Sequence, residues 1–477
     1  MTVTSAGATV AAGTFTVTPG LVLSVAVGPP TTTTTVSGAG FGANELVDLY
    51  YGLTDVALVS TTATGSFTYS GFVVPASAQP GTSWISAAGR RSGFGAQASF
   101  VVRTDWTQLG YKASGGRYNA YENSLNTSNV GGLGQAWTYS PGSAVESSIT
   151  VSGGLAYVLS SSSGLSAVDA TTGAVRWTYA AAGGGYSTPS VTGGVVYVGT
   201  NSGKVFALNA TTGALKWSYA TGSDTASSPV VSGGIVYIGS FNANVYALNA
   251  TTGALVWTST TGGAIYSSPV VSNGIVYIGS ADDYVYALNA TTGGSIWRYL
   301  TGGTVEGMPA VVNGVVYVGS DDQKFYALNA QTGSVLWTDS LGAIVYSSPA
   351  VANGVVYIGA SDSHVYALNA YTGATVWSTT TSGLVGASVA VANGVVYASN
   401  YADQVYALDA SYGGTLWTYT AGNSYYFDAP TVVNGTLYIG STDGRVNAFT
   451  LAGGLNPAAA ARPALSTLRP NRALRVG

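Results

Sequence analysis

The chain has 477 residues, of which only 34 are Asp, Glu, Lys or Arg, and 19 acidic against 15 basic residues give a net charge of −4. This balance excludes a basic nucleic-acid-binding surface, and the absence of Cys excludes thiolate metal sites, Cys nucleophiles and disulfides. The single histidine, His364, argues against a His-based zinc site or a Ser-His-Asp triad, and no apolar run reaches the ~18 residues of a membrane span.

The first 104 residues divide into two segments. Residues 1–13 form an N-terminal leader that lacks the basic start and long apolar core of a secretory signal peptide. Residues 14–104 contain seven short β-rich runs separated by Gly, Pro, Ser and Thr, which predicts an immunoglobulin-like (Ig-like) β-sandwich. A surface so poor in charge is unusual in the cytosol, so we expect an extracellular or cell-surface protein whose signal peptide is not visible in this sequence.

After a linker at 105–130, a repeat of 40 residues organises the chain from 131 to 450. Its clearest copy, Ser267 to Trp297, contains four short apolar runs bounded by turn residues, which predicts four strands. The first two runs are joined by Asn-Gly or Gly-Gly, as at Asn273-Gly274, a pair that suits a two-residue type I′ hairpin. Each copy is therefore predicted to be one four-stranded blade of a β-propeller. We expect the recurring tryptophans to pack blade against blade: Trp137, Trp177, Trp217, Trp257, Trp297, Trp337, Trp377 and Trp417.

The ends of the repeat region predict how the ring closes. The last copy begins at Asp428 and lacks its Trp strand, whereas the strand at 133–139 is a Trp strand with no copy before it. Pairing the two completes an eighth blade and removes an open sheet edge. The sequence thus predicts an all-β protein, an Ig-like sandwich followed by an eight-bladed propeller at 131–450, with a flexible basic tail at 451–477.

Two motifs carry family resemblances. The repeat Val-Tyr-Ala-Leu-Asn-Ala-Thr-Thr-Gly with its trailing Trp, as at Val245 to Trp257, resembles pyrroloquinoline-quinone (PQQ)-like β-propellers. That family includes quinoprotein alcohol and glucose dehydrogenases and an outer-membrane assembly lipoprotein, so the resemblance implies the fold more strongly than a function. Val36 to Gly42 (VSGAGFG), with Val74-Pro75-Ala76 later, is similar to Ig-like repeats of bacterial surface proteins.

One position in each blade is a candidate for ligand binding. The residue three before the Pro of the Ser-Ser-Pro motif opens the innermost strand, at the rim of the central channel. Glu146 and Glu306 occupy this position four blades apart, so we expect them to face each other across the axis. The pattern favours a polar-aromatic funnel for a planar or sugar-like ligand or for a cation; the alternative is that these side chains only cap the rim. The candidates are Glu146, Tyr186, Tyr266, Glu306, Tyr346 and Phe427.

Other polar groups have simpler interpretations. Acids recur in the loops between the second and third strands, but they fall in different blades, so we predict no metal site. His364 is expected to be solvated. The loop acids are Asp282, Asp283, Asp321, Asp322, Asp362, Asp403 and Asp443. Asn-x-Ser/Thr sequons, whose glycosylation the sequence does not decide, occur at Asn126, Asn209, Asn249, Asn289 and Asn434.

Three functions remain open. A quinoprotein dehydrogenase would need PQQ, Ca²⁺, an acidic base and a basic group near the quinone, but no basic residue of 131–450 is an evident quinone partner. An outer-membrane assembly scaffold would be a lipoprotein with an N-terminal Cys. We favour a non-enzymatic extracellular or cell-surface protein, without catalytic residues or cofactor, whose propeller binds protein or carbohydrate partners or self-assembles.

Overall fold

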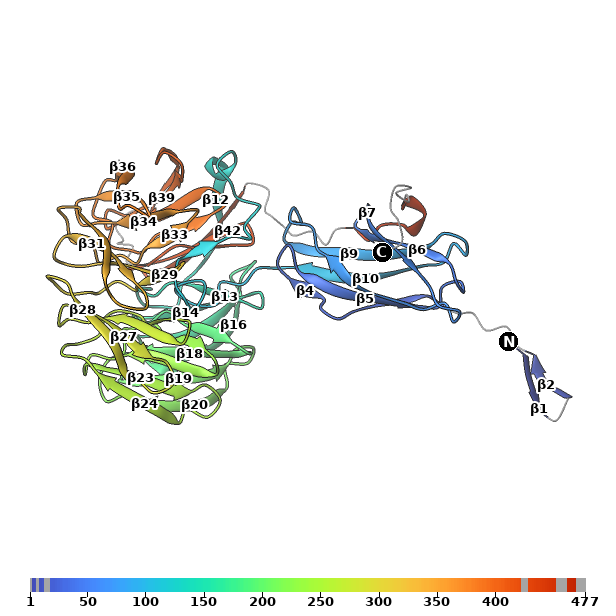
Figure 1. Cartoon of the computed structure of the whole chain (residues 1–477), viewed down its shortest axis with the longest axis horizontal. Coiled ribbons are helices and arrows are strands. Elements are labelled where there is room, and N and C mark those ends of the chain that lie inside the picture. Colours follow the sequence, from blue (N-terminus) through green and yellow to red (C-terminus); the bar gives the residue numbers. More distant parts are fainter. Residues whose placement is uncertain (1, 6–7, 13–17, 422–427, 452–460, 469–477) are drawn as a thin grey trace. The chain divides into compact units, whose positions relative to one another are not determined.

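The computed structural model describes all residues except 1, 6–7, 13–17, 422–427, 452–460 and 469–477 (Figure 1). The chain divides into two compact units, Met1–Thr104 with Leu455–Gly477, and Asp105–Gly454. No helix among the described residues is long and apolar enough to span a membrane. The helices of these residues are three short 3₁₀ turns: η1 (Val130–Gly132), η2 (Ala180–Ala182) and η3 (Leu465–Thr467).

The first unit contains a hairpin and two sheets that share one apolar core. Val36, Leu49, Phe72 and Phe100, which come from both sheets, are fully buried in that core. The hairpin is β1 (Thr2–Ser5) with β2 (Ala8–Ala12). The first sheet runs β3 (Gly20–Leu23), β5 (Thr33–Ala39), β8 (Phe67–Val73). The second runs β4 (Val27–Gly28), β10 (Gly95–Val102), β9 (Gly81–Gly89), β6 (Leu46–Tyr51), β7 (Thr54–Ser60).

Part of the predicted tail belongs to this first unit. Arg462 donates from Nε to Oε1 of Gln97, and its guanidinium lies 5.2 Å from the ring centre of Trp84. Gln97 in turn donates to the carbonyl of Pro463 at 2.8 Å, and Leu468 is buried. Side-chain and backbone groups at 462–463 of the predicted flexible tail thus contact β9 and β10.

The second unit is built almost entirely from four-stranded antiparallel sheets, taken here in chain order. The first four are β13 (Thr150–Ser152), β14 (Leu155–Ser160), β15 (Gly164–Asp169), β16 (Val175–Tyr179); β17 (Ser190–Thr192), β18 (Val195–Thr200), β19 (Lys204–Asn209), β20 (Leu215–Ala220); β21 (Val230–Ser232), β22 (Ile235–Gly239), β23 (Asn244–Asn249), β24 (Leu255–Thr260); and β25 (Val270–Ser272), β26 (Ile275–Gly279), β27 (Tyr284–Asn289), β28 (Ser295–Leu300).

The remaining sheets include the two that depart from the simple repeat. β11 (Tyr118–Asn119) adds a parallel strand to the sheet of β37, and β12 (Leu133–Tyr139) pairs with β43. These sheets are β29 (Ala310–Val312), β30 (Val315–Gly319), β31 (Lys324–Asn329), β32 (Val335–Ser340); β33 (Ala350–Ala352), β34 (Val355–Gly359), β35 (His364–Asn369), β36 (Thr375–Thr380); β37 (Ala390–Ala392), β38 (Val395–Ser399), β39 (Gln404–Asp409), β40 (Thr415–Thr420); and β41 (Thr431–Val433), β42 (Thr436–Ser441), β43 (Arg445–Leu451).

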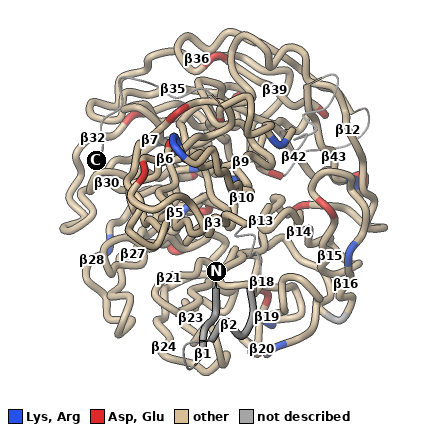
Figure 2. Tube along the Cα trace, turned by 90° about the vertical axis from the view of Figure 1, so that its right-hand side faces the viewer, with Lys and Arg blue, Asp and Glu red and all other residues tan. Residues whose placement is uncertain are grey.

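The sheets stand around a central axis, with the shortest strand of each innermost. Figure 2 shows the outermost strands, such as β20, β24 and β28, at the periphery, and the inner strands β13 and β21 near the axis. The last sheet adjoins the first, because the Ala429 N–H donates to Ser148 Oγ at 3.2 Å and Thr431 Oγ1 donates to the Ile149 carbonyl at 2.7 Å. The predicted β-propeller is confirmed, and β12 closes its ring.

The tryptophan column joins each sheet to the next. Trp257 is 8% exposed, and its Nε1–H donates to the carbonyl of Ala290 at 3.0 Å. The hydroxyl of Tyr237 donates to the same carbonyl at 3.0 Å, so a single backbone oxygen accepts from two side chains. The indole donor recurs around the ring, at Trp137, Trp177, Trp217, Trp297, Trp337, Trp377 and Trp417.

The turns have the backbone angles that their residues predict. Asn273 and Gly274 have φ of 49° and 77°, as a type I′ hairpin requires. Gly293, in the turn between β27 and β28, has φ of 73°, and a Cβ built there would lie 2.7 Å from ring atoms of Trp257. Glycine at 293 thus allows both the left-handed turn and the approach of the indole.

We expect Gly293→Ala to lower the free energy of unfolding by about 2–3 kcal/mol, because left-handed strain adds to overpacking against Trp257. Gly274→Ala is the matched control: it also has positive φ, but nothing lies within 4 Å of its added Cβ, so its cost should be about 1 kcal/mol. Denaturant unfolding of both variants measures the difference. Equal losses would show that contact with the indole contributes nothing.

Candidate functional site

The segment predicted as a linker lies along the inner strands of the ring. Trp106 exchanges backbone hydrogen bonds with Val151 at 2.8 and 2.9 Å in the first sheet, and β11 pairs with β37 in the second-last sheet. Between these points, successive carbonyls of the segment accept from the inner strands at Val191, Val271, Val311, Val351 and Val391. One segment, folded into turns, therefore contacts sheet after sheet around the ring and closes this end of the channel.

Arg117 fixes the closing segment in place. It is fully buried and donates from Nε to the Val389 carbonyl at 2.7 Å, from Nη2 to the Pro430 carbonyl at 2.8 Å, and from Nη1 to the Leu109 carbonyl. Its guanidinium also lies 5.4 Å from the ring centre of Trp106. The sequence analysis missed this residue, since a single Arg outside the repeats has no periodic signal.

Asp428 is the buried acid associated with Arg117. It is 1% exposed, and its Oδ2 accepts the Gly440 N–H at 2.6 Å. Ser187 makes the equivalent bond in another sheet, accepting the Gly199 N–H at 3.2 Å. Asp428 thus stands where the repeat has Ser. Burial raises the pKa of Asp428 to about 8, against a smaller lowering by its hydrogen bonds and by the positive charge of Arg117.

The raised pKa of Asp428 predicts a pH-dependent stability. The folded chain holds this proton up to about pH 8, whereas the unfolded chain releases it near 3.8, the ordinary pKa of an aspartate side chain. Stability should therefore fall as the pH rises from 4 to 8, because the folded state binds more protons in that range. Between pH 4 and pH 8 the free energy of unfolding, measured from unfolding curves, should decrease less in Asp428→Asn than in wild type. The difference between the two decreases should be at least about 1 kcal/mol, the equivalent of one pKa unit. If the stability of both proteins changed with pH to the same extent, Asp428 would not be the group with the raised pKa.

Beyond the closing segment the channel is a cup of about 550 Å³ that is open to solvent. Five of the six predicted rim residues line it: Glu146, Tyr186, Tyr266, Glu306 and Tyr346. Phe427 lies outside the described residues. Leu109 of the closing segment and Met308 also contribute to the lining. The position within the repeat therefore brings these five side chains together, as expected.

Hydroxyl groups of the Ser-Ser-Pro motif surround the same cavity. The Ser148 N–H donates to Thr188 Oγ1 at 3.1 Å, the Thr188 N–H to Ser228 Oγ at 2.9 Å, and the Ser228 N–H to Ser268 Oγ at 2.8 Å. Each hydroxyl thus links its blade to the preceding one. Met308 replaces the next hydroxyl and interrupts this series. The wall beneath the rim consequently carries neutral hydroxyl groups.

The two glutamates of the cup are held in an environment that disfavours their charge. Burial raises the pKa of Glu146, and burial together with the charge of Asp321 raises the pKa of Glu306. Asp321 has its own pKa raised by burial and by Asp283 and Asp322. No Lys or Arg occurs among the described residues that line the cup.

A second tier of side chains stands behind the rim. Phe241 contacts Tyr266 with ring centres 4.6 Å apart. A Cβ added at Gly386 would lie 2.6 Å from the hydroxyl of Tyr401 and 2.5 Å from the ring of Tyr346, so the glycine leaves room for both. The sequence analysis missed Phe241 and Tyr401. Their signal was available: they share one repeat position with Asp321, at intervals of 80 residues.

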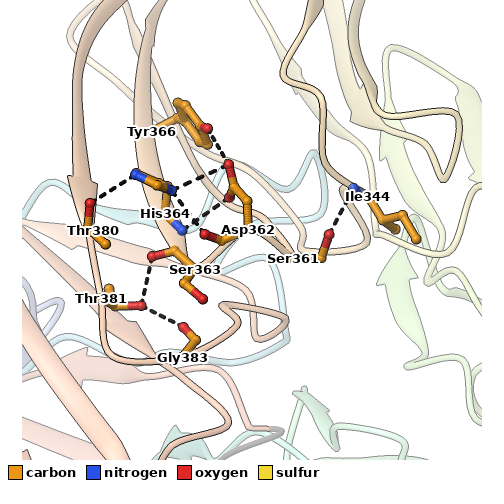
Figure 3. Close-up of polar contacts among 9 residues, drawn as sticks. All are labelled: Ile344, Ser361, Asp362, Ser363, His364, Tyr366, Thr380, Thr381 and Gly383. Carbon is orange, nitrogen blue, oxygen red and sulfur yellow. Dashed lines mark hydrogen bonds and ion pairs between the residues drawn. The ribbon is translucent and has the colours of Figure 1, made fainter.

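His364 lies away from the cup, at the start of β35 (Figure 3). Its Nδ1 is 3.4 Å from Asp362 Oδ2, and its Nε2 is 2.9 Å from Thr380 Oγ1. This acid–histidine–hydroxyl series follows from the repeat, because Asn244 pairs in the same way with Thr260 at 2.7 Å. His364 is partly exposed at 31% of its side chain, so the contacts are those of a surface cross-strand pair.

The remaining polar candidates serve the turns. Asp282 Oδ2 accepts the Gly262 N–H at 2.6 Å and the Tyr286 hydroxyl at 2.5 Å, and Asp322 accepts the Gly302 N–H at 3.0 Å. In the sequon turns, Asn209 Oδ1 accepts two backbone N–H groups at 2.9 Å. Within the part of the chain that the structure describes, no three acids or histidines are grouped so as to hold a metal ion.

The repeat region matches one family over most of its length. The sequence model described as outer membrane protein assembly factor BamB matches residues 132–228, 223–306, 281–385 and 361–456, which together exceed half of the chain. The chain belongs to this family of PQQ-like propellers. A comparison with curated proteins gave no match.

Solved structures show the same fold. BamB from Moraxella catarrhalis is 21% identical, with a TM-score of 0.57 over 67% of this chain and 99% of its own. A quinohemoprotein alcohol dehydrogenase from Comamonas testosteroni is 17% identical, with a TM-score of 0.65 over 74% and 81%. Another such dehydrogenase, ADHIIG from Pseudomonas putida HK5, is 18% identical, with a TM-score of 0.64 over 77% and 82%. At these identities the likeness extends to the fold alone.

Proposed function

We propose that this chain is a non-enzymatic extracellular or cell-surface protein in which an eight-bladed propeller is the binding platform and an Ig-like sandwich is a spacer. Among the described residues of the second unit, eight sheets follow one another at the spacing of the 40-residue repeat, which supports an eight-bladed ring. In the first unit, two sheets of three and five strands share one core, as in an Ig-like sandwich. The sparse charge that Figure 2 shows fits a surface that meets its partners through Tyr, Ser and Thr.

The chemistry of the cup is the observation that carries this proposal. PQQ is a quinone with three carboxylates, so a site for it needs cationic groups. The described lining instead offers Glu146 and Glu306 without Lys or Arg. Arg117, the nearby buried cation, already donates to three carbonyls. The residues therefore do not fit PQQ, and we assign no redox step to this chain.

A second candidate is an outer-membrane assembly scaffold, and the family match favours it. Such a role would use the same propeller to hold protein partners rather than a small ligand. Exposed aromatic side chains suit this use, since Tyr371 is 73% exposed and Tyr412 66% exposed in turns of two sheets.

Calorimetric titration of the full chain with PQQ and Ca²⁺, beside a glycan array probed with the same protein, tests the proposal. We expect no heat with PQQ and selective retention on the array. Micromolar binding of PQQ that is lost in a Glu146→Gln, Glu306→Gln double variant would overturn the proposal and restore the dehydrogenase. Failure on the array, with specific capture of an outer-membrane protein, would favour the scaffold.

A further inference from the structure

The cup has two unlike walls. One wall is aromatic: Tyr186 is 50% exposed, Tyr266 is 43% exposed, and Phe241 packs against Tyr266 from behind. The adjoining wall groups Glu306 with Tyr346, which hold the same repeat position one and two sheets after Tyr266, and Asp321 and Tyr401 lie close to them. Burial raises the pKa of both Tyr346 and Tyr401, and the charge of Glu306 adds a smaller increase to each, which places these phenols within its electrostatic reach.

The acidic wall carries negative charge that the described residues do not neutralise. After burial, the charge of Asp321 contributes to the raised pKa of both Glu306 and Tyr346. Its Oδ1 is buried without a hydrogen-bond partner among the described residues. The cup lining offers no Lys or Arg in the described residues. Neighbouring carboxylates without a cation beside them leave a negative potential in the cup, so a cation arriving from solution would be stabilised at this wall.

The aromatic wall and the lower cavity set further requirements on the ligand. Half-exposed tyrosine rings attract a C–H face or a cation, and the hydroxyls of Thr188, Ser228 and Ser268 present neutral polar groups to the cavity. Because the closing segment blocks one end of the channel, a chain-like ligand can insert only its end into the cup and cannot pass through the ring.

We propose that the cup binds a compact amine-bearing saccharide, an amino sugar, with its ammonium group beside Glu306 and its C–H face against Tyr266. The ammonium supplies the missing positive charge next to Tyr346 and Tyr401, and the sugar hydroxyls meet the hydroxyl-lined lower wall. This inference rests on the proposed function, since it names the ligand class that the binding platform would take.

Calorimetric titration of the full chain with glucosamine, glucose and N-acetylglucosamine tests the proposal. These probes differ in charge at one carbon while keeping the sugar ring. We expect glucosamine to bind at least 10-fold more tightly than the two neutral sugars. Glu306→Gln, which preserves shape but removes the charge, should weaken glucosamine binding at least 10-fold and leave the weak affinity for glucose unchanged. Tyr266→Leu should weaken all three.

Asp339→Asn is the matched control, because this carboxylate lies on the outer strand β32 and should not affect binding. Unfolding midpoints of all variants must equal that of wild type, so that loss of binding is separated from loss of fold. Equal affinity for glucose and glucosamine, or unchanged binding in Glu306→Gln, would overturn the proposal. If no sugar or amine binds the cup while array binding survives in Glu306→Gln, the ligand assignment fails and the surface platform stands.

Discussion

Replacing Arg117 with methionine should lower the free energy of unfolding by about 3–5 kcal/mol, measured by denaturant unfolding at pH 9, above the pKa of about 8 at which Asp428 ionises. The side chain is fully buried and satisfies the carbonyls of Leu109, Val389 and Pro430, which come from the closing segment and two sheets. Methionine fills similar space but leaves three buried acceptors and the nearby Asp428 without their cation. The same substitution should loosen the closing segment, so that its amide hydrogens exchange faster than those of the blades.

Arg176→Met is the control for this prediction, since the Arg176–Asp169 pair is exposed and should cost less than about 1 kcal/mol. Asp428→Ser, which introduces the residue that most of the other repeats carry, should recover part of the loss when combined with Arg117→Met. The coupling between the two changes should reach about 0.5–3 kcal/mol, the range for residues of one network. A loss below 1 kcal/mol in Arg117→Met, or strictly additive effects, would show that Arg117 does not organise the closed end.

The blades could be predicted because the repeat places the same physical demand on the chain every 40 residues. Each copy needs a tight hairpin, and Asn273-Gly274 supplies it with the required positive φ angles. Each copy also needs a large side chain with one donor between neighbouring sheets, and Trp257 meets this need at Ala290. The rim residues follow from the same register, since Glu146 and Glu306 keep one position within the repeat and therefore one place in the ring.

The closed end could not be predicted, because its contacts join the repeats to a segment that does not repeat. Arg117 reaches carbonyls 272 and 313 residues away in the sequence, at Val389 and Pro430. The second tier of the cup was missed for a different reason. Phe241 and Tyr401 come from loops, and the direction of a loop side chain depends on packing against the next sheet, as with Tyr266.

Truncating one tryptophan of the column should cost about 3–5 kcal/mol, as large aromatic truncations in cores do. In Trp257→Ala the indole leaves a cavity between two sheets, removes the hydrogen bond to the Ala290 carbonyl, and withdraws the ring that packs 5.8 Å from Tyr237. Gly293 beneath the indole cannot fill the space, since it has no side chain. Thermal or denaturant unfolding of the full chain measures the loss.

Trp257→Phe separates packing from hydrogen bonding in this prediction. Phenylalanine keeps most of the apolar area, and the hydroxyl of Tyr237 still donates to Ala290, so we expect a loss of only about 1–2 kcal/mol. Trp217→Ala and Trp297→Ala should each match Trp257→Ala within about 0.5 kcal/mol, because all three indoles make the same bond at 2.9–3.0 Å. Unequal losses at the three positions would mean that the blades, although alike in sequence, do not contribute equally to the stability of the ring.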